Sequence, residues 1–262
     1  MLSANSVRTD SNSAKPLLQK NDAIAVAALL SLCALPLGWA GLVAPFLWLL
    51  LHAIESSVGW KRALAYGFSA LLMLAAASGQ VPGSERIALM PPYIDNDGNR
   101  IYASFNAGKA AIAAAVMAFM IRRRQWFKPA DLPIVLAAIA LPFFAGLMIY
   151  GPSLKFGAAI GVAALINLLV VCISEEGFFR WVLQRGGELF LGRWIAALVV
   201  TALFTLLHTG WAVSPLALGL VSLAGFGYAL LWCLRRNFWV CVLAHWGVNL
   251  LHLLFLPYPL PA

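Results

Sequence analysis

Apolar residues run along this chain in long blocks that short polar stretches interrupt. The first block, 23–54, has about 32 residues and would measure roughly 48 Å as one helix, which exceeds the ~30 Å core of a bilayer. Because Pro36 and Gly38 interrupt it, we expect a hairpin of two short helices, with one long kinked helix as the alternative. The later blocks each have about the length of one span, at 61–78, 107–121, 132–150, 157–173, 194–209, 213–234 and 238–255.

This pattern predicts an all-α, polytopic transmembrane helix bundle with eight or nine spans. The count is nine if 23–54 crosses the membrane twice and eight if it crosses once. Residues 79–104 are the longest polar stretch between apolar blocks. They carry turn signals such as Pro91-Pro92 and Asp97-Gly98, so we expect a polar external loop there. No internal repeat is apparent.

Composition supports a membrane protein, because 62% of the 262 residues are hydrophobic and only 11% are charged. The net charge of +8 comes from short basic clusters between apolar blocks, so we expect the lipid bilayer and not nucleic acid as a partner. The four cysteines lie in apolar blocks without metal-ligand spacing and are interpreted as small core residues. No cleavable signal peptide is expected, because a polar stretch and then an overlong apolar block open the chain.

The basic clusters give one orientation, since positively charged connections stay in the cytoplasm. Four connections share this character: Lys61/Arg62, 122–128, Arg185/Arg193 and Arg235/Arg236. The loop at 79–104 then lies outside. The N-terminus is cytoplasmic only if 23–54 crosses twice. Small size and compact loops are typical of bacterial inner-membrane proteins, and we expect a multi-pass protein of that membrane.

Two adjacent carboxylates and an arginine follow the apolar block 157–173. Ionisable groups at membrane depth are costly unless they are paired or face a polar cavity, so this cluster is a candidate site. Glu176 and Arg180 are four residues apart on a helix and can pair. Glu175 points about 100° away from Glu176 and is free for another role. The simpler interpretation is that all three cap a helix end.

Two further polar pairs interrupt later spans, Phe204-x-x-x-His208 and His245-x-x-x-Asn249. Counted from the nearest basic connection, Glu175, His208 and His245 lie at depths of roughly 15, 22 and 14 Å. The three positions therefore converge within the bilayer. Each pair alone could serve as interhelical hydrogen bonding. We expect packing for His252 and a snorkelling side chain for Lys109, near the start of its span.

In this order the three motifs resemble those of the CAAX-protease and bacteriocin-processing (CPBP, ABI-type) intramembrane endopeptidases, over residues 174–249. The segment 102–109 is also similar to a loop-to-helix stretch of some bacterial members. Peptide hydrolysis needs an activated water and a group that stabilises the oxyanion. Glu175 and His208 suit the first task, and His245 and Asn249 the second. The resemblance implies the same roles, with Glu176, Arg180 and Phe204 supporting them.

These residues do not decide whether a metal ion takes part in the reaction. Glu175, His208 and His245 could form a three-ligand zinc site, and the same set could work as a metal-free, glutamate-type site.

We expect a peptide or protein substrate at the membrane; the oligomeric state is not indicated. Two rival functions are a non-proteolytic immunity or regulatory protein of the same fold and a proton-coupled transporter. The expected organisation is a disordered cytoplasmic N-terminus at 1–22, an N-terminal transmembrane region at 23–150 and a C-terminal transmembrane catalytic core at 151–262.

Overall fold

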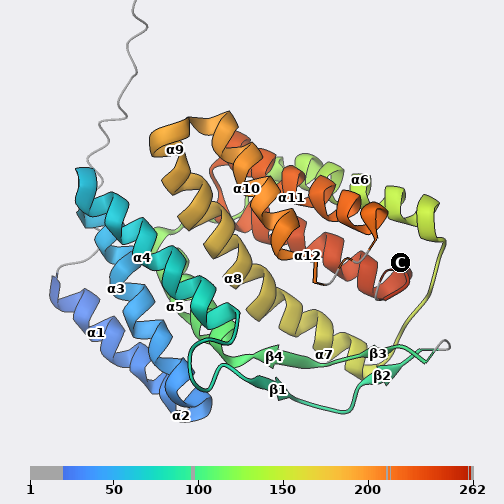
Figure 1. Cartoon of the computed structure of the whole chain (residues 1–262), viewed down its shortest axis with the longest axis horizontal. Coiled ribbons are helices and arrows are strands. Elements are labelled where there is room, and N and C mark those ends of the chain that lie inside the picture. The colour runs from blue at the N-terminus through green and yellow to red at the C-terminus, as the bar shows by residue number, and fades with distance from the viewer. Residues whose placement is uncertain (1–19, 96–97, 211, 213, 259, 261–262) are drawn as a thin grey trace, which may run out of the picture.

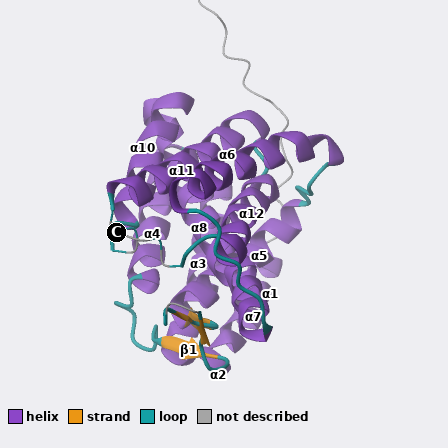
Figure 2. Ribbon diagram, turned by 90° about the vertical axis from the view of Figure 1, so that its right-hand side faces the viewer, coloured by secondary structure: helices purple, strands orange, loops and turns teal. Residues whose placement is uncertain are grey.

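The computed structural model describes residues 20–95, 98–210, 212, 214–258 and 260. This part of the chain is mostly helical, with four short strands gathered at one end of a helix bundle (Figures 1 and 2). The predicted helical bundle is therefore confirmed, whereas the strands were not predicted. Most of the stretch expected to be disordered, residues 1–19, lies outside the described residues, and the first helix begins at Lys20.

The first apolar block folds as a hairpin and not as one kinked helix. Its elements are α1 (Lys20–Leu30), a 3₁₀ turn (Ser31–Cys33), α2 (Ala34–Leu37), a second 3₁₀ turn (Gly38–Leu42) and α3 (Val43–Ser56). The chain reverses where Gly38 takes a φ of +56°, which favours glycine. Trp48 then donates a hydrogen bond of 2.9 Å from Nε1 to the carbonyl of Ala23. The two arms therefore pack side by side.

The polar loop between the next two helices contains two small antiparallel ribbons. The elements here are α4 (Gly59–Ala77), β1 (Arg86–Ala88), β2 (Tyr93–Ile94), β3 (Arg100–Ile101), β4 (Ser104–Asn106) and α5 (Ala107–Arg123). Strand β1 pairs with β4, and β2 pairs with β3. Asn106 ends β4 and caps α5, since its side chain accepts a hydrogen bond of 2.8 Å from the amide of Lys109. The ribbons thus hold the start of α5 in place.

The C-terminal half begins with a helix and continues with one long helical segment, Ala158–Leu191. The elements are a 3₁₀ turn (Pro129–Asp131), α6 (Leu132–Tyr150), α7 (Ala158–Ile166), α8 (Ile173–Glu176), α9 (Arg185–Leu191), α10 (Arg193–Leu207), α11 (Pro215–Arg235) and α12 (Phe238–Phe255). Two π-helical stretches, Asn167–Cys172 and Gly177–Gln184, flank α8. π turns are rare and often mark functional sites. The expected connection at 185–193 is shorter than predicted, because α9 continues to Leu191.

Five helical segments of the described residues are long and apolar enough to cross a membrane by length and composition. They are Asp22–Ser56, Pro129–Tyr150, Ala158–Leu191, Pro215–Arg235 and Phe238–Phe255. Large apolar side chains on their outward faces, such as Met148 at 87% exposure, fit contact with lipid. The protein is therefore polytopic. The count of eight or nine spans stays a prediction, because α4, α5 and α10 are not among these five segments and each arm of the first segment is short.

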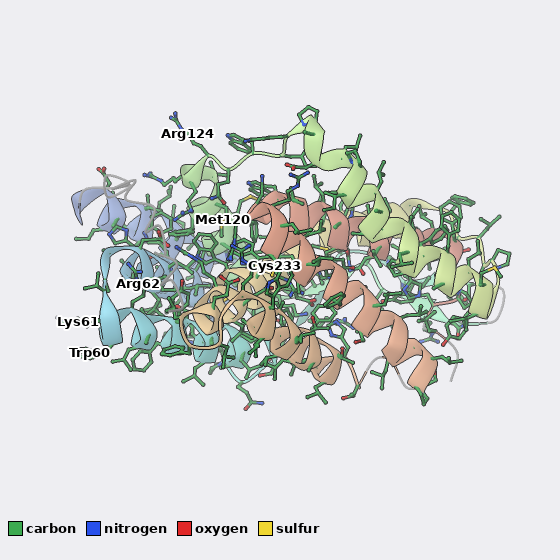
Figure 3. The ribbon with its side chains drawn as sticks, turned by 90° about the horizontal axis from the view of Figure 1, so that it is seen from above. Trp60, Lys61, Arg62, Met120, Arg124 and Cys233 are labelled. Carbon is green, nitrogen blue, oxygen red and sulfur yellow. The ribbon has the colours of Figure 1, made fainter. Side chains whose placement is uncertain are left out.

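The two ends of the bundle differ in charge. We call the end that carries Lys61, Arg62, 122–128, Arg185, Arg193 and 235–236 the basic end, and the end that carries the strands the loop end. Four ion pairs tie the basic end together: Arg123–Glu55 at 2.7 Å, Arg185–Glu55 at 2.5 Å, Arg235–Asp131 at 3.1 Å, and Arg236–Glu188. Figure 3 shows Lys61, Arg62 and Arg124 toward the same end of the molecule. The clusters predicted to share one side therefore do so.

Candidate functional site

A cavity of about 540 Å³ lies inside the bundle. The long helical segment Ala158–Leu191, which contains α8, crosses the centre of the molecule between the N-terminal helices and α10–α12 (Figure 1), and this cavity lies against it. Its wall includes Glu175, His208, His245 and Asn249. The structure therefore brings together the four side chains that the three sequence motifs singled out.

Glu175 divides its two carboxylate oxygens between different neighbours. Oε1 accepts a hydrogen bond of 2.7 Å from Nζ of Lys109. Oε2 is buried, has no hydrogen-bond partner among the described residues, and lies 3.9 Å from Nε2 of both His208 and His245. One oxygen thus holds the carboxylate in place, and the other faces two imidazole rings.

Hydrogen bonds on the far side of each ring fix both histidines. Nδ1 of His208 lies 2.7 Å from the carbonyl oxygen of Phe204, and Nδ1 of His245 lies 2.8 Å from Oε1 of Glu176. Since both partners only accept, each Nδ1 must carry the proton, and this assigns the tautomer. Nε2 of each ring is therefore the nitrogen that faces Glu175.

Aromatic rings pack against the two imidazole rings. Phe204 stacks on His208 with ring centres 4.3 Å apart, and Tyr228 stacks on His245 at 4.7 Å. Phe204 also meets the ring of His245 edge-on at 5.9 Å. Tyr228 was not found by sequence analysis, because one tyrosine in an apolar helix carries no distinguishing pattern.

Glu176 faces away from the cavity into a fully buried polar network. Its Oε2 accepts a hydrogen bond of 3.1 Å from Nε of Arg180, the pair that the spacing indicated. Arg180 continues to Gln184 and to the carbonyl of Gly225. Glu176, Arg180 and Gln184 are all 0% exposed. Gly225 is required here, because a Cβ at this position would stand 2.7 Å from the ring of Phe204. The network links Arg180 to His245 through Glu176.

Asn249 belongs to a second polar contact that sequence analysis missed. Its Nδ2 donates to Oδ1 of Asn167 at 3.2 Å, and the Cys172 thiol donates to the same oxygen. Asn167 and Cys172 are five residues apart, a spacing that shares a face within the π-helical stretch that they bound. The sequence signal that could have identified this contact is Asn167 itself, a lone asparagine at membrane depth. The same Nδ2 also donates to Sγ of Cys172 at 3.9 Å, so both contacts hold the Asn249 amide at the cavity wall.

Lys109 corrects an expectation, because it does not snorkel toward the surface. It stands in the first turn of α5, and its ammonium group reaches Glu175 across the cavity wall. Close packing of α5 on the long helix makes this possible, since a Cβ on Gly177 would stand 2.7 Å from the side chain of Val116. Glu175 therefore has an ionic partner that comes from another helix.

His252 lies on the same cavity wall but makes a different contact. Its Nε2 is 2.9 Å from the carbonyl oxygen of Pro257, and its ring is 5.5 Å from that of Tyr258. The contact joins the end of α12 to the segment that follows it. This agrees with the packing role expected for His252.

The chemistry of Glu175, His208 and His245 suits zinc, but their spacing does not. Tetrahedral zinc with bonds of about 2.0–2.2 Å places two donor atoms about 3.4 Å apart. Oε2 of Glu175 is 3.9 Å from each Nε2, and the Lys109 ammonium occupies the other oxygen. In the described part of the chain, no group of three His, Cys, Asp or Glu side chains could hold a metal ion. The residues as placed therefore do not fit this metal.

Comparison with known proteins identifies the segment that carries the site. Residues 155–251 match the family model described as type II CAAX prenyl endopeptidase Rce1-like. No curated protein and no solved structure matches the chain. The matched residues contain all three motifs and exclude Lys109. The resemblance seen in the order of those motifs is thereby confirmed: residues 155–251 of this chain match the Rce1-like type II CAAX prenyl endopeptidase family.

Proposed function

We propose that the chain is an intramembrane endopeptidase that hydrolyses a peptide bond of a membrane-associated protein or peptide. The observation that carries this proposal is the position of Glu175 Oε2, which faces Nε2 of His208 and His245 at 3.9 Å each. Each gap leaves room for a water oxygen within about 2.8 Å of the carboxylate oxygen and of the facing ring nitrogen. The match to an endopeptidase family supports the proposal.

The numbers of hydrogen-bond donors and acceptors around such a water indicate where the protons lie. A water has two hydrogens, and Glu175 Oε2 and the neutral rings of His208 and His245 would offer it three acceptors. A water held by all three groups at once therefore requires one of the rings to be protonated. That ring is His245, because its Nδ1 faces the Glu176 carboxylate, whereas Nδ1 of His208 faces a neutral carbonyl. Water then donates to Glu175 and His208 and accepts from His245.

The reaction follows from this arrangement. Glu175 takes a proton from the water as its oxygen attacks the scissile carbonyl carbon, and the carbonyl oxygen becomes an oxyanion. The protonated ring of His245 donates to that oxyanion, and so does the Asn249 amide, which exchanges its weak contact of 3.9 Å to the Cys172 sulfur for this bond. Collapse breaks the C–N bond, and Glu175 returns the proton to the leaving amine. Glu176 stabilises the positive charge on His245 throughout.

The test is hydrolysis in labelled water. Full-length protein in proteoliposomes is mixed with a library of quenched fluorescent peptides that carry apolar segments, in H₂¹⁸O. A hydrolase releases products whose new carboxyl termini contain ¹⁸O, as mass spectrometry would show. Absence of products from the whole library, or products equally abundant with Glu175→Gln, would favour the regulatory or transporter function instead.

Metal removal should leave activity in place. Because the donor atoms stand too far apart for zinc, we expect the turnover of chelator-treated protein to match that of untreated protein. The measurement is peptide cleavage after dialysis against EDTA or 1,10-phenanthroline, with and without added zinc. Loss of activity that only zinc restores would show that Glu175, His208 and His245 close around a metal during turnover.

Replacing Lys109 should lower turnover without weakening substrate binding. Its ammonium orients the Glu175 carboxylate, and a charge-assisted hydrogen bond is worth about 1.5–3 kcal/mol, so Lys109→Met should reduce kcat about 10–100-fold. KM should change little. Lys109→Arg keeps a donor and a positive charge and should recover part of the loss. An unchanged or raised kcat in Lys109→Met would show that the ion pair restrains the base.

A further inference from the structure

Positive charge is distributed unequally between the two ends of the bundle. The basic end carries the four clusters named above, and its Glu55 and Asp131 are paired with arginines. The described loop end carries four basic residues: Arg86, Arg100, Lys109 and Lys155. Of these, Lys109 is paired with Glu175, and Lys155 is buried. The asymmetry places the basic end in the cytoplasm.

The cavity extends from Glu175 toward the loop end. Its wall includes Arg86, at the start of β1, and Tyr102, between β3 and β4. Both side chains are exposed, Tyr102 at 50%. Lys109, at the loop end of α5, also lies on the wall and keeps 27% of its side chain exposed. The exposed part of the wall is therefore contributed by the strands and by the start of α5.

Toward the basic end the cavity is closed by two layers. The first is the Glu176–Arg180–Gln184 network, in which every residue is 0% exposed. Behind it lies Trp181, only 2% exposed, which packs edge-on against Phe119 and Trp232. A peptide arriving from the basic end would have to break these buried ion pairs and displace the tryptophan.

From these observations we infer that the catalytic cavity opens on the extracytoplasmic side, and that its substrate is an apolar peptide segment presented at the outer face of the membrane. That this peptide is a substrate rests on the proposed function, whereas the direction in which the cavity opens does not. The apolar character follows from the wall, where Met73, Ile112 and Phe178 surround the polar groups.

The experiment uses single cysteine substitutions in the full chain, in right-side-out and inside-out membrane vesicles. Tyr102→Cys and Ala88→Cys report on the loop end, and Lys61→Cys is the matched control at the basic end. Three of the native cysteines are buried, and unsubstituted protein gives the background labelling. The probe is a bulky, membrane-impermeant maleimide, and the readouts are labelling and peptide cleavage relative to the same variant without the reagent.

We expect Tyr102→Cys and Ala88→Cys to be labelled in right-side-out vesicles and to lose that labelling in inside-out vesicles, with the reverse for Lys61→Cys. Labelled Tyr102→Cys should lose cleavage activity, and labelled Lys61→Cys should keep it. Labelling of both loop-end variants mainly from the cytoplasmic side overturns the inference, as does full activity of labelled Tyr102→Cys. If unsubstituted protein cleaves no peptide, the proposed function fails, while the labelling still decides the direction in which the cavity opens.

Discussion

Glu175→Gln should lower peptide cleavage about 10²–10⁴-fold, the usual contribution of a general base. Glutamine keeps the size of the side chain and one oxygen that can accept from Lys109, but it cannot take a proton from water. Stability should change little, because Lys109, the partner left without a carboxylate, keeps 27% of its side chain exposed and stays solvated. The measurements are kcat/KM in proteoliposomes and thermal unfolding of the same preparation in detergent micelles.

Glu176→Gln is the matched control, one residue away and with the same chemical change. Both oxygens of Glu176 are engaged, one by Arg180 and one by His245, so neither is free to act as a base. This variant should lose less activity than Glu175→Gln and should also be less stable. An active Glu175→Gln beside an inactive Glu176→Gln would reverse the two roles.

Arg180→Met should destabilise the protein by about 3–5 kcal/mol, the range for breaking a buried ion pair by removing one partner. The substitution leaves Glu176 charged, fully buried and without its arginine. It also removes the donors to Gln184 and to the carbonyl of Gly225. The measurement is the thermal unfolding midpoint in micelles, with Arg193→Met, exposed at the start of α10, as the control.

A second variant tests whether the buried charge causes the effect. In the double substitution Glu176→Gln with Arg180→Met, no charge remains in the network, so the protein should be more stable than Arg180→Met alone. A double variant that is less stable than Arg180→Met would mean that packing around the guanidinium, and not the unpaired carboxylate, causes the loss.

The parts of the site that sequence predicted are local in the chain. Glu176 with Arg180, Phe204 with His208, and His245 with Asn249 are each four residues apart, so helix geometry alone aligns them. Their common depth then follows from counting residues to the nearest basic connection. Helix periodicity and the cost of burying polar groups in a membrane indicated one site, and the order of the three motifs resembled that of a known family.

The parts that sequence missed depend on which helices pack together. Lys109 stands 66 residues before Glu175, and the pair exists only because α5 packs tightly on the long helix at Gly177. Likewise, Tyr228 and Asn167 become recognisable only once their neighbours are known. The ribbons in the loop were missed because strands of two or three residues are too short for an alternating pattern to stand out.

Lys109 lies outside the residues that match the family model, although it contacts the site that they contain. The domain over residues 155–251 supplies the carboxylate, the imidazoles and the amide, but the cation that holds the carboxylate comes from a helix outside it. The N-terminal half can therefore alter the strength of the base without changing any residue of the shared motifs. The functional unit is thus larger than the unit of sequence similarity, and residues 155–251 alone would carry the motifs without the orientation of Glu175 that Lys109 provides.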